Sequence, residues 1–151
     1  DEVLSQLDFV VASVHNRLRQ DKELMTKRMC NAAKNVQTTI IGHPTGRLIL
    51  GREPSEYDMQ LFLDVCAKNG TVVELNANPH RLDLNALHLS MAKERGVLVS
   101  INADAHSTSG LDDLRYGVMI ARKAGLRAKD VLNTFSLPEM KTWLKSKKNE
   151  K

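Results

Sequence analysis

Asp104 and His106 are the two residues of this chain whose types and spacing most directly indicate chemistry. They stand two positions apart, just beyond the apolar run Val97–Asn102. Side chains alternate along an extended backbone, so these two face the same side, where a carboxylate and an imidazole can bind one cation. Proteins hold Zn²⁺ and Mn²⁺ with ligands of these types. The pair therefore predicts a divalent-metal site.

His15 and His43 occupy the same kind of position, each shortly after an apolar, strand-like run of its own. A single histidine after a strand is more often a hydrogen-bonded loop residue than a metal ligand. Sites in α/β folds, however, are built at the carboxyl ends of parallel strands. The recurrence of polar strand ends therefore predicts one shared pocket and favours a metal-assisted hydrolase.

Short β-branched runs alternate with helix-like segments along the chain. The expected strands are Leu7–Ser13, Thr38–Gly42, Thr71–Asn76 and Val97–Asn102. The expected helices are Lys22–Lys34 (capped by Asp21), Pro54–Asn69, Asn85–Glu94, Leu111–Lys123, Ala128–Asn133 and Pro138–Lys145. Continuously apolar strands in this alternation predict an α/β fold with a parallel sheet or barrel, as a single domain over residues 1–151.

Four further residues have both a functional and a structural interpretation. Glu74 lies in an apolar strand, where it either pairs with a cation or accepts hydrogen bonds from a neighbouring strand end. Arg47 and Arg81 either bind phosphate, which a guanidinium matches with two hydrogen bonds, or form a salt bridge, for example with Asp83. His80 either faces the site or lies in a surface loop.

The composition is that of an ordinary globular protein and excludes few classes of function. The net charge is +4, and part of the basic excess gathers at Arg17, Arg19, Lys27 and Arg28, which permits a polyanionic partner without requiring one. No apolar run approaches the roughly 20 residues that cross a membrane, so we expect no membrane association. The two cysteines show no CxxC spacing and are expected to be buried thiols of a reducing cytoplasm.

Several motifs, in order along the chain, resemble the PHP (polymerase and histidinol phosphatase) domain. The resemblance is strongest to the PHP domain at the C-terminus of bacterial and archaeal family X DNA polymerases. The motifs are ASVH (Ala12–His15), GHPTGR (Gly42–Arg47), ELNANPHRLDL (Glu74–Leu84), NADAHS (Asn102–Ser107), RYG (Arg115–Gly117) and VLNT (Val131–Thr134). Together they span nearly the whole chain.

This resemblance implies a fold, a cofactor and an activity. The family fold is a distorted seven-stranded β/α barrel with up to three metal ions, usually Zn²⁺ or Mn²⁺, at the strand ends. Four residues fall on family ligand positions: His15, His43, Asp104 and His106. Three are candidates for substrate binding: Arg47, His80 and Arg81. The implied reaction is phosphoester hydrolysis, which in family X polymerases resembles a 3′-5′ exonuclease that trims DNA 3′ ends.

The chain also departs from the family pattern. The family places an HxH pair, a further histidine and an acidic ligand on strands that precede the first strand here, and no HxH occurs in this sequence. We therefore expect the C-terminal part of a PHP domain, truncated on its N-terminal side. It would be a partial barrel of about four β/α units with C-terminal helices, and it would bind fewer metal ions than the intact domain.

The expected partners follow from the same resemblance. They are the missing N-terminal half of the domain, a polymerase domain and DNA 3′ ends, and an exposed sheet edge invites homo-oligomers. We expect the parent protein to be active and the isolated chain to be weak or inactive. Two other functions stay open: a small-molecule phosphatase resembling histidinol phosphatase, and a non-catalytic module that positions DNA or serves a structural role.

Overall fold

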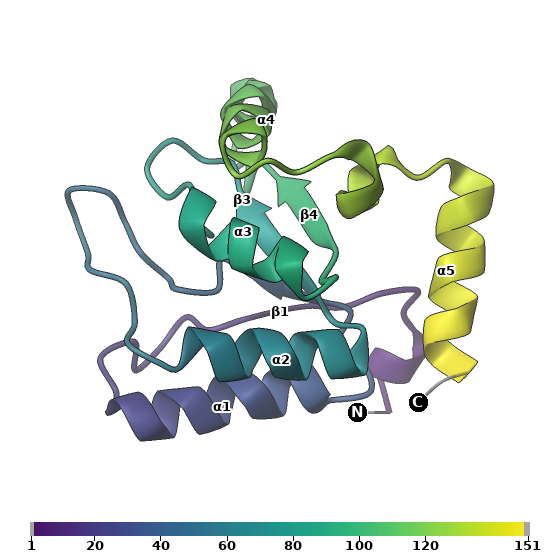
Figure 1. Cartoon of the computed structure of the whole chain (residues 1–151), viewed down its shortest axis with the longest axis horizontal. Helices are drawn as coiled ribbons and strands as arrows, with labels where there is room; N and C mark the ends of the chain where they lie inside the picture. Colours follow the sequence, from purple (N-terminus) through teal and green to yellow (C-terminus); the bar gives the residue numbers. More distant parts are fainter. Residues whose placement is uncertain (1, 150–151) are drawn as a thin grey trace.

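Four parallel strands form one sheet at the centre of the computed structural model, which describes the backbone of residues 2–149 and the side chains of residues 2–147 (Figure 1). The strands are β1 (Val11–Ser13), β2 (Ile40–Gly42), β3 (Val72–Asn76) and β4 (Val99–Asn102), side by side in chain order. Each neighbouring pair is parallel. The predicted α/β fold with a parallel sheet is therefore confirmed.

The first strand is shorter than predicted, because only its last three residues, Val11–Ser13, pair with β2. Among the described strands β1 lies at one edge of the sheet and pairs only with β2, which begins at Ile40, so the ladder of β1 extends no further than that strand. Just before the strand, the carbonyl of Val10 accepts the N–H groups of Thr39 and Ile40.

Three helices follow the first three strands, and their capping residues decide where they begin. α1 (Lys22–Lys34) begins as predicted, because the Asp21 carboxylate accepts two N–H groups of the first turn. α2 (Met59–Asn69) does not begin near Pro54, because its cap is Asp58, which accepts the N–H of Leu61. α3 (Ala86–Glu94) is capped in the same way by Asn85.

After β4 the chain is helical, as predicted, but the elements differ in type and length. The 3₁₀ turn η2 (Thr108–Asp113) replaces the first part of the expected helix, and α4 covers only Leu114–Lys123. The expected helix Ala128–Asn133 is two 3₁₀ turns, η3 (Ala128–Asp130) and η4 (Leu132–Thr134), because Val131 between them is extended and bridges to Val99 of β4. α5 (Leu137–Asn149) is longer than predicted, and another 3₁₀ turn, η1 (Leu4–Gln6), precedes β1.

One face of the sheet forms the main hydrophobic core. Alternate residues of the strands, such as Ile41, Val73 and Val99, pack against Met29 of α1 and Phe62 of α2 in one buried cluster. Figure 1 shows α1, α2 and α3 on this side, with α5 apart from them beside η1. Burial of these side chains, at about 25 cal/mol per Å² of apolar surface, holds the strand ends at fixed relative positions.

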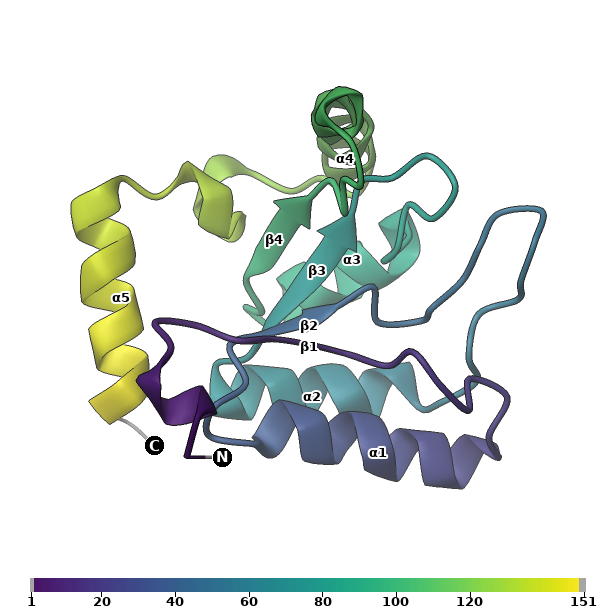
Figure 2. The same cartoon turned by 180° about the vertical axis from the view of Figure 1, so that it is seen from behind.

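Figure 2 shows the opposite face of the sheet from the front, with α5 at its side. Ile40 and Val72 pack there against Leu132 of η4, with Trp143 of α5 at the margin. A cavity of about 480 Å³ lies on this face, apolar where α5 borders it and polar toward the carboxyl ends of β3 and β4. Within residues 2–149, no helix is both long and apolar enough to cross a lipid bilayer.

Candidate active site

The polar strand ends identified in the sequence lie at one edge of the sheet. Ser13 of β1 is in register with Gly42 of β2, and Asn76 of β3 is in register with Asn102 of β4. Because all four strands run in the same direction, the segments that follow them leave the sheet on the same side. The predicted gathering of polar strand ends is thus present.

His15 and His43 lie against each other at this edge. Their ring centroids are 5.0 Å apart, with the rings at 73°. His15 is exposed, whereas His43 is buried, and its Nδ1 has no hydrogen-bond partner among the residues that the structure describes. Burial, followed by the positive charge of Arg81, lowers the pKa of His43. A neutral imidazole with an unpaired buried nitrogen is a suitable donor for a metal ion.

Glu74 fixes the backbone at His43. Its Oε2 accepts the N–H of His43 at 2.5 Å, and its Oε1 accepts the side-chain amide of Asn102 at 2.8 Å. His43 has φ = 27°, in the left-handed region, so its conformation depends on such a contact. A Cβ on the preceding Gly42 would meet Ser13 Oγ at 2.5 Å, which explains the glycine there. Of the two interpretations of Glu74, the structure therefore supports the hydrogen-bond acceptor.

Asp104 follows β4 with φ = 52°, also in the left-handed region. Its Oδ2 accepts the side-chain amide of Asn76 at 3.0 Å and lies 3.3 Å from Nε of Arg81. The salt bridge suggested between Arg81 and Asp83 is therefore wrong, since Arg81 pairs with Asp104 instead. Nη1 of Arg81 is buried and has no hydrogen-bond partner in the described part of the chain. That N–H group is therefore left without an acceptor among the described residues.

His106 turns back toward Asp104. Its Nδ1 lies 2.7 Å from the Asp104 carbonyl oxygen, and the ring is exposed. A proton on Nδ1 satisfies this contact and leaves Nε2 as an acceptor directed elsewhere. This is the arrangement in which a second partner sets the tautomer of a metal-binding histidine.

Asp83 and Arg47 shape the loops beside the site. The fully buried Asp83 carboxylate accepts the N–H groups of Thr45 and Gly46, at 3.0 and 2.9 Å. Burial raises its pKa to about 6, against the opposing effects of these donors and of Arg47. Arg47 donates to the carbonyls of Arg81 and Leu82. Its suggested salt bridge with Asp83 is absent, because backbone oxygens take these two N–H groups.

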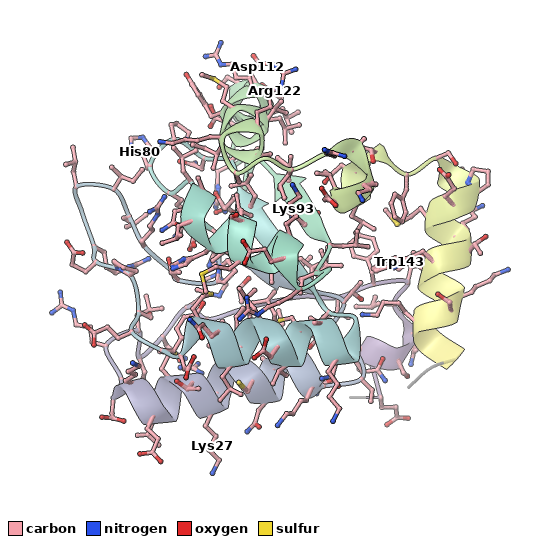
Figure 3. All side chains as sticks on the ribbon, in the orientation of Figure 1. Lys27, His80, Lys93, Asp112, Arg122 and Trp143 are labelled. Atoms are coloured by element: carbon pink, nitrogen blue, oxygen red, sulfur yellow. The ribbon has the colours of Figure 1, made fainter. Side chains whose placement is uncertain are left out.

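His80 lies at the surface, in the loop between β3 and α3, where Figure 3 shows it projecting outward. The structure thus agrees with the surface-loop interpretation of this residue. Asn76 has a bridging role that was not predicted from the sequence, since its amide contacts both Glu74 (3.3 Å) and Asp104. A polar residue at the end of an otherwise apolar strand is the signal that could have identified it.

The four predicted metal ligands form two pairs, His15 with His43 and Asp104 with His106. The contacts through Glu74 and Asn76 connect the pairs into one network. Within residues 2–149, no three His, Cys, Asp or Glu side chains form a group that could hold a metal ion. The described residues therefore supply donors of suitable chemistry without a complete coordination shell.

No family model matches the chain. The chain is 44% identical to the DNA polymerase/3′-5′ exonuclease PolX of Bacillus subtilis over 145 residues, which cover 96% of this chain and 25% of that protein. This chain is similar to part of a family X DNA polymerase. The likeness confirms the resemblance found in the motifs and fits a PHP-type domain from the C-terminal part of such a polymerase.

Probable phosphatases are more distant relatives. One from Thermoanaerobacter sp. (strain X514) is 29% identical over 157 residues, which cover 98% of this chain and 61% of that protein. Another, from Caldanaerobacter subterraneus subsp. tengcongensis, is 27% identical and is covered over 59% of its length. The chain thus spans about a quarter of the Bacillus polymerase and about three fifths of these phosphatases.

Proposed function

We propose that the chain is part of a metal-dependent phosphoesterase that hydrolyses DNA from its 3′ end within a family X DNA polymerase. The observation that carries the proposal is the contact of His15 with His43, whose buried Nδ1 has no hydrogen-bond partner in the described part of the chain. The printed names of the relatives, an exonuclease and probable phosphatases, support phosphoester hydrolysis as the reaction class.

The donor set suits a borderline divalent cation. Two imidazoles come from His15 and His43, and a carboxylate and a third imidazole come from Asp104 and His106. We propose that these residues hold Zn²⁺ or Mn²⁺, with fewer than the three ions of an intact family site. When bound, such a metal supplies an activated water and stabilises charge on the leaving oxygen.

The residues around this donor set would bind and orient the substrate. Nη1 of Arg81 has no hydrogen-bond partner among the described residues and would donate to a phosphate oxygen, a contact that suits a guanidinium. Arg47 positions Arg81 by holding the carbonyl of that residue at 2.7 Å. Glu74 keeps His43 oriented, and exposed His80 is left to contact a longer substrate. Of the three predicted substrate-binding residues, Arg81 would thus contact the phosphate, Arg47 would position Arg81, and His80 would contact more distant parts of the substrate.

The outer edge of β1 is a place where a further strand could pair with the sheet. β1 pairs only with β2 among the described strands, and the nearby Phe9 and Val11 are 53% and 45% exposed. We propose that an N-terminal half of the domain, or else a second copy of the chain, pairs there and completes the metal shell. The isolated chain would then be weakly active or inactive.

Metal content and nuclease activity test the proposal together. The chain and the full-length protein that contains it are loaded with Mn²⁺, dialysed and analysed by mass spectrometry, then given a 5′-labelled oligonucleotide. We expect shortening from the 3′ end by the full-length protein and a loss of about 100-fold or more in the Asp104→Asn variant. The matched control is Asp112→Asn, which removes an exposed carboxylate from η2 (Figure 3). Equal activity in the two variants would reject the proposal.

Two alternatives predict different substrates. The probable phosphatase relatives favour a small-molecule phosphatase, which would turn over histidinol phosphate faster than oligonucleotide 3′ ends. A non-catalytic DNA-positioning module would contain no metal and would bind DNA in a strongly salt-dependent way. The same preparations distinguish all three functions.

A further inference from the structure

The loop between β2 and α2 carries an apolar tip that the proposed function does not use. Figures 1 and 2 show this loop projecting beyond the helices. At its tip Leu50 is fully exposed and Ile49 is 42% exposed. Burying a leucine side chain stabilises a folded protein, and the folded chain does not obtain that contribution from Leu50.

The tip is held rigidly in this exposed position. Leu48 and Arg52 exchange backbone hydrogen bonds of 2.9 and 2.8 Å across it, and Gly51 donates to the Leu48 carbonyl. Leu50 has φ = 62°, an unfavourable backbone for a leucine. The loop therefore fixes an apolar side chain in solvent at a cost in backbone strain.

The same loop is attached to the candidate active site. The N–H of Ile49 donates to the carbonyl of His80 at 2.7 Å, and Arg47 donates to the next carbonyl, that of Arg81. Arg81 in turn pairs with Asp104. The tip thus stands beside the phosphate-binding position that we assign to Arg81.

Positive charge lies within this loop and in the turn that packs on its base. Arg47 and Arg52 lie in the loop, and Arg17 and Arg19 lie in the turn that packs on it through Leu18. None of these four arginines forms an ion pair with the described residues. Glu53 and Glu56 lie in the same region, lining a cavity of about 380 Å³ with Arg19 and Arg52, so the local excess is positive. This charge favours a polyanion over a protein surface as the partner.

We propose that Leu50 and Ile49 form an apolar wedge that packs against the terminal base of a nucleic-acid 3′ end, while Arg52 of the loop and Arg17 and Arg19 of the turn at its base contact backbone phosphates. The inference rests on the proposed 3′-end function and adds the contact that recognises the end. Apolar side chains are used in this way to separate stacked bases, and arginines supply the affinity that does not depend on sequence.

A binding experiment without hydrolysis tests the wedge. The 151-residue chain is titrated, in EDTA, into an oligonucleotide with 2-aminopurine at its 3′ end, because the fluorescence of this base reports its stacking. Leu50→Asn removes the apolar side chain and suits the left-handed backbone. The matched control is Leu87→Asn, which removes a 67% exposed leucine from α3.

We expect Leu50→Asn to weaken binding about tenfold or more and to abolish the fluorescence change, with Leu87→Asn unaltered. The association constant for a single strand falls as the salt concentration rises. In the double variant Arg17→Gln/Arg19→Gln, the slope of log K against log salt concentration should be less steep by about 1.4. Equal behaviour of Leu50→Asn and Leu87→Asn, or no binding by the chain, would overturn the wedge. Because no hydrolysis is involved, a full-length protein that lacks nuclease activity would reject the proposed function and leave this result standing.

Discussion

Arg81 and Asp104 form an ion pair beside the candidate metal site, with Nε 3.3 Å from Oδ2. The pair places a protein cation on a carboxylate that we assign to the metal. The Arg81 guanidinium and a metal ion would therefore compete for the Asp104 carboxylate. The metal ion must either share this carboxylate with the guanidinium or displace the guanidinium from it.

Removal of Arg81 should therefore strengthen metal binding. We expect Arg81→Gln to raise the affinity of the chain for Mn²⁺ about fivefold, since a partly exposed charge pair contributes up to about 1 kcal/mol. Calorimetric titration with Mn²⁺ measures the change. Arg95→Gln is the matched control, because Arg95 forms an ion pair of 2.6 Å with Asp64 in another part of the fold. Unchanged or weaker affinity in Arg81→Gln would contradict the competition.

The Glu74 carboxylate should be important for stability. It accepts N–H groups from His43, Asn76 and Asn102, and a glutamine would direct its own N–H₂ group at some of these donors. We expect Glu74→Gln to lower the free energy of unfolding by about 2 kcal/mol. Urea denaturation measures this loss. The exposed Glu94→Gln should change it by less than about 0.5 kcal/mol, and similar values for both variants would argue against the proposed role of Glu74.

Asp83 should make stability depend on pH. Its pKa is about 6 in the folded chain against the ordinary 3.8, so the folded state favours the protonated carboxyl group. The contribution of Asp83 is therefore largest below pH 3.8 and is lost as pH rises through 6. Relative to Asp83→Asn, the wild-type chain should lose about 2 kcal/mol of unfolding free energy between pH 4.5 and pH 7.5. A constant difference across this range would show that the carboxyl does not titrate in this way.

The two cysteines should be unreactive in the folded chain. Both are buried, and burial raises the pKa of Cys30 and raises that of Cys66 to about 12. Because the thiolate is the reactive form, we expect negligible labelling by a disulfide reagent at pH 8 and labelling of both thiols in urea. Fast labelling of either thiol in the native chain would contradict this burial.

The positions of individual elements were predictable where a local signal decided them. Asp21 is a capping residue followed by an amphipathic run, and α1 begins and ends as predicted. Pro54 was a misleading signal, because the helix start was decided by Asp58. Val131 divides the expected helix Ala128–Asn133 through its bridge to β4, a contact between segments far apart in the sequence.

In the candidate site, too, the positions of the residues were predictable from the sequence and their partners were not. The sequence placed His15, His43 and Asp104 after parallel strands, and the sheet brings those strand ends to one edge. The partners of these residues were not predictable, since Arg81 had two aspartates available and pairs with Asp104, while Asp83 accepts backbone N–H groups instead.

The sequence by itself determined the alternation of strands and helices, the polar strand ends and the motifs that resemble a PHP domain, because these depend on side-chain type and local spacing. Only the tertiary structure decided that Glu74 fixes His43, that Asn76 connects Glu74 to Asp104, and that Arg81 occupies the Asp104 carboxylate. The reason is physical: each buried polar group takes whichever partner the packed sheet and loops bring within hydrogen-bond distance, and that geometry is a property of the whole fold.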